Sequence, residues 1–194
     1  MTVLESGNGQ RGAGYGTFMT TPTPTSPRIE YTTPGLDEND ARQVIALLQE
    51  RLHACNGLHL TLKHVHWNVV GPQFIAVHEM IDPQVDDVRL MADDLAERIA
   101  TLGGSPQGTP EALAAAHEQS YDVGRAPTQE HLAALDVFYR GIIAKHRSAI
   151  DELDKLDLVT QDMVIGQTEK LELFHWFVRA HLEDQSGRLA TDKG

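Results

Sequence analysis

Four long stretches of this sequence repeat their apolar residues at intervals of three and four, and this periodicity constrains the fold more than any other feature. Such a repeat places the apolar side chains on one face of an α-helix. In the first stretch, the apolar positions are Val44, Leu48, Leu52, Cys55, Leu62 and Val65. These stretches favour Leu, Ala and Met over alternating Val and Thr, and aromatic residues make up only 6% of the chain, so an all-β fold is a poor match.

The turn residues set the expected helix limits. Pro72 and Pro110 suit first helical turns, Gly103 and Gly104 suit the end of a helix, and Pro83 predicts a local kink. Long helices are expected near residues 37–66, 72–101, 127–155 and 160–183, with a short helix near 111–117. Well-marked loops and irregular heptads disfavour a long coiled coil. The expected fold is therefore all-α, a ferritin-like four-helix bundle with a short extra helix between its second and third helices.

The ends of the chain differ from its middle in composition. Residues 1–35 are rich in Gly, Pro, Thr and Ser and show no helical periodicity, which predicts a flexible tail. The bundle is expected over 36–184 and a short C-terminal tail over 185–194. The formal net charge is -12, and the N-terminal tail is neutral, so the remainder carries the whole excess. An acidic protein is poorly suited to bind nucleic acid over its main surface and is compatible with handling cations.

Composition also excludes several classes of protein. Cys55 is the single cysteine, so neither an intrachain disulfide nor a thiolate zinc cluster can form. No apolar run approaches the roughly 18 residues of a membrane span, and the first residues lack the layout of a secretory signal. We therefore expect a cytoplasmic protein with no membrane partner, associated with the nucleoid only if it binds DNA.

Two pairs of potential metal ligands lie on the second expected helix. His78 and Asp82 are four residues apart, as are Asp93 and Glu97, so each pair shares one helix face. The step from Asp82 to Asp93 leaves them only about 20° apart around the axis but about 16 Å apart along it. One ion cannot bind both pairs within one chain. If two copies of the helix pair antiparallel across a twofold axis near Asp87, each pair completes the other, which predicts a metal site that exists only in a dimer.

A fifth ligand is available from His66, at the end of the first expected helix. Two imidazoles and three carboxylates form a nitrogen and oxygen shell that suits iron or manganese, with zinc as a further option. Any one of these residues, like His64 or Trp67 beside them, is more often a packing, capping or surface residue. The symmetry of the whole set favours the functional interpretation.

The same residues carry a family resemblance. The run His66-Trp-Asn-Val-Val-Gly-Pro-Gln-Phe74, followed by His78, Asp82, Asp93 and Glu97, resembles the signature of the Dps family, the ferritin-like DNA-protection proteins of starved bacteria. Two longer runs, Leu58–Pro72 and Phe174–Glu183, resemble its actinobacterial members. The match covers about residues 36–183.

The resemblance implies a ferroxidase and iron-storage protein. His66, His78 and Asp82 would come from one subunit and Asp93 and Glu97 from its twofold mate, within a hollow homo-dodecamer. Such proteins oxidise Fe(II), preferably with hydrogen peroxide, and store the ferric mineral inside, which serves iron homeostasis and limits oxidative stress.

Further acidic residues are candidates for supporting roles. Glu79 and Asp86, on the edge of the ligand stripe, are candidates for mineral nucleation, although solvated surface charge explains each equally well. Asp157 and Asp162, near the start of the fourth long helix, are candidates to line a threefold pore that concentrates cations. The family often has a further acid one turn on, where this chain has Gly166.

Two competing interpretations remain. A conventional ferritin would hold a di-iron centre inside one bundle through Glu-x-x-His motifs on its second and fourth helices. Here these motifs, Glu50–His53 and Glu172–His175, fall on the first and fourth, which favours helix-surface pairs. The alternative function is a nucleoid-binding architectural protein with secondary iron chemistry. Because both tails contain few Lys and Arg residues, we expect weak or absent DNA binding.

Overall fold

The computed structural model describes residues 32–116 and 119–183. It contains the expected four long helices and the short one. They are α1 (Glu38–Asn68), α2 (Phe74–Thr101), α3 (Pro110–Ala116), α4 (Thr128–Leu153) and α5 (Leu158–Leu182), with two short strands, β1 (Val69–Val70) and β2 (Ala126–Pro127). The expected C-terminal tail and all but the last four residues of the N-terminal tail lie outside the described residues.

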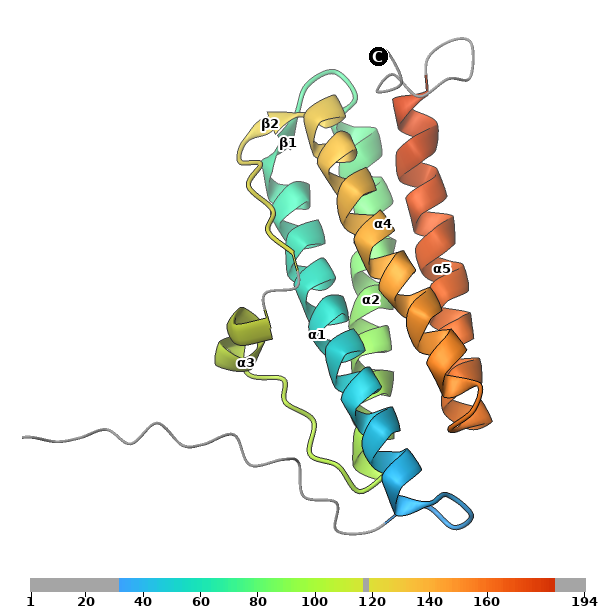
Figure 1. Cartoon of the computed structure of the whole chain (residues 1–194). Helices are drawn as coiled ribbons and strands as arrows, with labels where there is room; N and C mark the ends of the chain where they lie inside the picture. Colours follow the sequence, from blue (N-terminus) through green and yellow to red (C-terminus); the bar gives the residue numbers. More distant parts are fainter. Residues whose placement is uncertain (1–31, 117–118, 184–194) are drawn as a thin grey trace, which may run out of the picture.

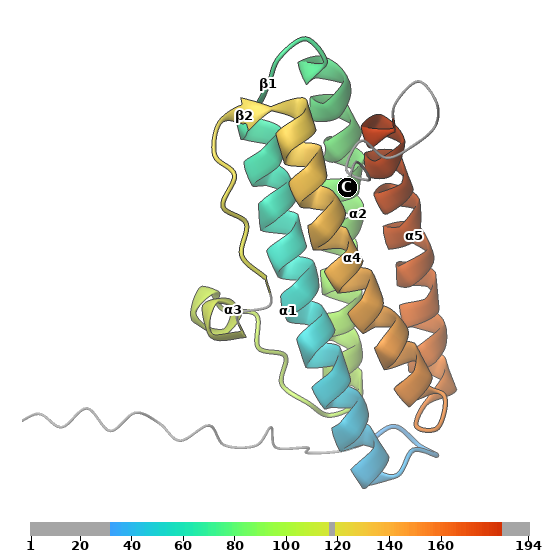
Figure 2. The same ribbon diagram turned by 45° about the horizontal axis from the view of Figure 1, so that its top comes forward.

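The long helices lie side by side as two antiparallel hairpins (Figures 1 and 2). One hairpin is α1 with α2 and the other is α4 with α5, and each helix packs most extensively against its hairpin partner. The short α3 stands beside α1, in the long connection that runs from α2 to α4. This is the predicted four-helix bundle. Among the described residues, none of the helices combines the length and the hydropathy of a membrane span.

Local capping interactions explain where the helices begin. Asp37 caps α1, because its side chain accepts a hydrogen bond of 2.8 Å from the Asn39 amide. Thr109 caps α3 through the Ala112 amide at 3.2 Å, and Pro110 occupies the first helical position as predicted. The end of α2 is also as expected, since Gly103 has a positive φ of 85°.

Two expected helix starts were wrong by two residues. Pro72 does not open α2, which begins at Phe74 because residues 71–73 form a tight turn in which the Phe74 amide donates to the Gly71 carbonyl oxygen at 3.0 Å. The last helix begins at Leu158 rather than Thr160, because Asp157 supplies a side-chain cap there. Helix α2 continues through Pro83, which lies inside it.

A two-residue parallel bridge joins the two hairpins at one end of the bundle. Val69 pairs with Ala126 and Val70 with Pro127, next to the turn between α1 and α2. Figure 1 shows this bridge above the end of α1. The segment before α4 is thereby fixed against the end of α1, where His66 lies.

The core between the four helices is mainly aliphatic, and the positions predicted from the periodicity of α2 are buried: Ile81, Val85, Val88, Ala92, Leu95 and Ile99. Cys55 is fully buried, and burial raises the pKa of its thiol to about 12. Ile165 of α5, although apolar, is exposed. Among the described residues, no aspartate or glutamate is buried.

Candidate metal centre

Three of the five expected ligands lie together at the bridged end of the first hairpin. His66 is in the last turn of α1, and His78 and Asp82 are in the first turns of α2. One potential ligand atom from each residue lies within 4.8 Å of the others, and no other such group occurs among the described residues. The turn over 69–73 creates this arrangement, because it reverses the chain directly after His66.

The two histidines hold each other in a fixed orientation. Their rings stack with centroids 3.6 Å apart. His78 Nδ1 lies 2.9 Å from the His66 carbonyl oxygen, and His66 Nδ1 lies 3.2 Å from the His78 carbonyl oxygen. Because a carbonyl oxygen only accepts hydrogen bonds, both Nδ1 atoms must carry protons. With Nδ1 used in this way, Nε2 is the ring nitrogen left to bind a metal ion.

The carboxylate of Asp82 completes the group and remains accessible. It lies 3.1 Å from His66 Nδ1 and is 51% exposed. The Lys63 ammonium lies 3.3 Å from the same carboxylate oxygen and 5.8 Å from the centroid of the exposed Trp67 ring. Lys63 therefore acts as a counterion where a metal cation would otherwise balance Asp82. Sequence analysis missed Lys63, although its position one turn before His66 was a usable signal.

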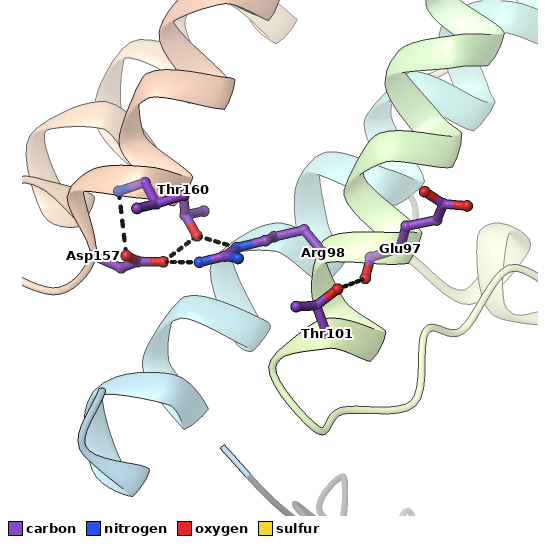
Figure 3. A network of polar contacts seen from close by, with 6 residues as sticks. Glu97, Arg98, Thr101, Asp157 and Thr160 are labelled. Atoms are coloured by element: carbon purple, nitrogen blue, oxygen red, sulfur yellow. Dashed lines mark hydrogen bonds and ion pairs between the residues drawn. The ribbon is translucent and has the colours of Figure 1, made fainter. Parts of the chain in front are cut away.

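Asp93 and Glu97 do not join this group within one chain. Both are exposed on α2, on the side away from the buried positions of that helix. The carboxylate of Glu97 points away from the neighbouring Arg98 network in Figure 3. The ligand stripe thus divides into a histidine-rich half at one end of α2 and a carboxylate half near the other.

The two candidate pore residues differ sharply. Asp157 is enclosed by partners of its own chain: Arg98 Nη2 lies 2.6 Å from Oδ2, Thr160 donates to the same oxygen, and the Val159 amide donates to Oδ1 at 3.2 Å (Figure 3). Asp162 is exposed. Only Asp162 therefore keeps a carboxylate without an intrachain partner among the described residues. The candidate nucleation residues Glu79 and Asp86 are exposed as well.

The Glu-x-x-His motifs do not form a site inside the bundle. His53 contacts Gln49 and the Gln107 carbonyl oxygen, and Glu50 lies 3.6 Å from Arg51. In the other motif, the Glu172 side chain binds Arg147 and the His175 ring binds Asp136 at 2.7 Å. Glu50 and Glu172 lie at the helix surface, as the sequence favoured, whereas His175 and Asp136 are only 13% and 14% exposed. The bundle interior holds the Arg51 guanidinium and, among the described residues, no buried carboxylate. Such an interior is unsuitable for a di-iron centre, which needs carboxylate ligands.

Comparisons with known proteins show which family the chain belongs to. The family described as "Ferritin-like domain" matches residues 45–186. The DNA protection during starvation protein of Mycolicibacterium smegmatis is 55% identical over 170 residues, covering 84% of this chain and 93% of that protein.

Solved structures give the same result. The structure of Mycobacterium smegmatis Dps superposes with a TM-score of 0.82 at 55% identity, covering 84% of this chain and 94% of that one. DpsA14 from Streptomyces coelicolor superposes with a TM-score of 0.81 at 58% identity, covering 86% and 99%. With this identity over most of the chain, the shared fold and the matching family region, the protein belongs to the Dps family of ferritin-like proteins.

Proposed function

We propose that this protein oxidises Fe(II) with hydrogen peroxide at sites shared between two subunits, and stores the ferric product inside a hollow homo-dodecamer. The observation that carries the proposal is the cluster of His66, His78 and Asp82, whose potential ligand atoms lie within 4.8 Å of one another. Membership of a family whose named relatives protect DNA during starvation supports the same function.

The residues suit iron as a substrate. Two neutral imidazoles bind Fe(II), and carboxylates favour the harder Fe(III) product, so a mixed shell lowers the free energy of the oxidised state relative to the reduced one. Two Fe(II) ions lose one electron each, and one peroxide molecule accepts both electrons and two protons as its O–O bond breaks to give two water molecules. Removing both reagents prevents hydroxyl radical formation.

The remaining ligands come from a second copy of the chain. Asp93 and Glu97 lie on the same stripe as His78 and Asp82 but about 16 Å further along α2. An antiparallel pair of α2 helices brings Asp93 of one subunit opposite Asp82 of the other. Each dimer then holds two complete sites of two histidines and three carboxylates.

Two further acids extend the proposal. We assign the cation-attracting role at a threefold pore to Asp162, because the Asp157 carboxylate is already bound by Arg98 and Thr160. Glu79 remains a candidate for mineral nucleation, since it is exposed and on the edge of the ligand stripe. An Asp162→Asn variant should take up iron several-fold more slowly while its oxidation rate at saturating iron stays unchanged.

DNA binding is proposed to be weak. The N-terminal tail balances Arg11 and Arg28 with Glu5 and Glu30, and the chain after Glu183 balances Arg188 and Lys193 with Asp184 and Asp192. Because affinity for DNA depends on the number of phosphate contacts, few basic residues give little binding at about 150 mM salt. A gel shift that shows stable complexes at that salt concentration would contradict this.

The proposed reaction is tested by mixing Fe(II) and hydrogen peroxide with wild-type protein and with a His78→Ala, Asp82→Ala double variant. The expected result is rapid oxidation by the wild type and a large loss in the variant. Equal rates would exclude this site. A His53→Ala, His175→Ala double variant is the control and should retain activity; its inactivity would revive a site inside the bundle. An anomalous-scattering map of iron-soaked crystals locates the metal directly.

A further inference from the structure

Two opposite charges in the middle of α2 have no ion-pair partner within the described part of the chain. Asp86 and Arg89 are both exposed, and neither takes part in an ion pair or a side-chain hydrogen bond there. At 100° per residue, both lie within about 40° of Asp82 around the helix axis. They therefore sit on the stripe of candidate metal ligands, between its two halves.

Other charges on α2 have partners from their own chain. Asp87 binds Lys170 of α5 at 3.2 Å, and Arg98 binds Asp157 at 2.6 Å. These two α2 side chains point toward the second hairpin rather than along the ligand stripe. Of the two arginines in α2, only Arg89 has no carboxylate partner among the described residues.

The surface around this pair has the character of an interface. Arg89 and Asp93 line a hollow of about 520 Å³ between α1, α2 and the segment before α3, together with Leu52, Asn56 and Ala96. Leu60 and Leu90 are more than half exposed on the same two helices. Exposed apolar side chains mixed with unpaired charges are typical of protein contacts.

His59 of α1 shows that the charges gather at one place. Burial lowers the pKa of His59, the charges of Arg89 and Lys63 lower it further, and Asp86 opposes them. Arg89, Asp86 and Lys63 thus all lie close enough to His59 to act on it. The unpaired charges belong to the α1–α2 face that carries the candidate metal centre.

The proposed metal centre determines which residues of the partner subunit lie opposite Asp86 and Arg89. Asp82 opposite Asp93 of the partner subunit requires antiparallel α2 helices related by a twofold axis between Val85 and Leu90. In that register, Arg89 stands opposite Asp86 of the partner subunit, and the twofold axis repeats the pair. A slip by one helical turn in one direction places Asp86 opposite Asp93 of the partner subunit, acid against acid.

We infer that Arg89 and Asp86 form two symmetrical ion pairs across the dimer axis, in the register in which the metal sites are completed. The inference rests on the proposed function for the register. The partner at this surface is a second copy of this chain, because Arg89 of one copy has the charge opposite to that of Asp86 of the other. Asp86 then serves assembly rather than mineral nucleation.

A charge exchange tests the pairing in the full-length chain. Arg89→Asp and Asp86→Arg each place two like charges across the axis, and the exchange variant with both substitutions restores opposite charges at unchanged composition. Dissociation of the assembly across this interface is measured by sedimentation over a dilution series, with a chelator present so that metal does not bridge subunits. We expect each single variant to raise the dissociation constant at least about 100-fold and the exchange to return it to within about tenfold of wild type.

Asp94→Arg is the matched control, because it makes the same charge change on α2 about 120° away from Asp82. It should leave dissociation unchanged, and circular dichroism should show the same helix content in every variant. Singles that assemble like the wild type, or an exchange that is as dissociated as the singles, overturn the inference.

Iron oxidation by the same proteins separates the two proposals. If the wild type oxidises Fe(II) but both single variants assemble as the wild type does, the ion pairs are disproved and the proposed function stands. If assembly is lost in the single variants and restored in the exchange variant, but the wild type does not oxidise Fe(II), the ion pairs are supported and the proposed function is disproved.

Discussion

Two aspartates in this bundle have similar neighbours but different chemistry. Asp82 lies 3.1 Å from the His66 ring, and Asp136 lies 2.7 Å from the His175 ring. The side chain of Asp82 is 51% exposed, whereas that of Asp136 is 14% exposed. A histidine beside an aspartate therefore does not by itself mark a metal site.

The remaining neighbours account for the difference. Arg140 binds the second oxygen of Asp136 at 2.8 Å, so histidine and arginine together occupy both oxygens of that carboxylate. Near Asp82, both contacts use one oxygen, and a second histidine, His78, stacks on the first. A carboxylate with an unoccupied oxygen beside two imidazoles can accept a metal cation, and a saturated one stabilises the fold instead.

The largest expected effect separates the two aspartates by activity. Asp82→Asn should lower the rate of peroxide-driven Fe(II) oxidation at least about 100-fold, because it removes an anionic ligand from the proposed metal site. Asp136→Asn should stay within about twofold of wild type. Stopped-flow absorbance of the ferric product measures both rates. Equal losses in the two variants would remove the distinction.

Stability should show the opposite order. Asp136→Asn leaves Arg140 and His175 without their carboxylate at a mostly buried position, which should lower the free energy of unfolding by about 1–3 kcal/mol. Asp82→Asn, at an exposed position, should change it by less than about 0.5 kcal/mol. Denaturant unfolding of chelator-treated protein gives both values. A greater loss at Asp82 would contradict the comparison.

A third aspartate, Asp157, also has partners on both carboxylate oxygens, and its contribution to stability should depend on pH. Burial alone would raise the pKa of Asp157, but hydrogen bonds from Thr160 and Arg98 and the charge of Arg98 outweigh it and hold the pKa below its usual range. Its stabilisation is therefore present above the ordinary aspartate pKa of about 4 and is lost as pH falls through the lowered value.

Asp157→Asn keeps a capping oxygen but removes the charge. We expect the free energy of unfolding at neutral pH to fall by about 1 kcal/mol, and its decline in acid to be smaller than in the wild type. Unfolding measured between neutral pH and about pH 3 tests this. An unchanged acid decline would mean that Asp157 does not contribute to it.

The smallest effect concerns the counterion of the open site. Lys63→Gln removes a positive charge 3.3 Å from Asp82 and should tighten binding of Fe(II), or of Co(II) as a probe, about fivefold. Lys170→Gln is the matched control, since Lys170 lies 3.2 Å from Asp87 on another side of α2. Anaerobic calorimetry measures both affinities. The same gain in both variants would point to net charge rather than to local competition.

Much of the fold was predictable because helical periodicity is local. The buried positions of α2 follow directly from intervals of three and four, and the position of His66 relative to His78 follows from a single turn. The ligand stripe needed only the geometry of one helix. Completion of the site by a second chain is still a prediction.

The parts that sequence reasoning missed depend on contacts between distant segments. Asp157 looked like a free acid because Arg98, which binds it, is 59 residues away. The β1–β2 bridge has two residues on each side and leaves no periodic signal. Ile165 is an apolar residue but is exposed, and its apolar character alone does not predict this exposure.

The bridge between β1 and β2 also separates early from late steps in folding. His66 and His78 are 12 residues apart in the chain, so the hairpin that holds them closes a short loop at little entropic cost. Val69 and Ala126, by contrast, meet only when a loop of 57 residues closes. We expect the first hairpin to form before the bridge, because short-range contacts form faster than long-range ones. The histidine half of the proposed metal centre thus belongs to the part of the chain that folds first.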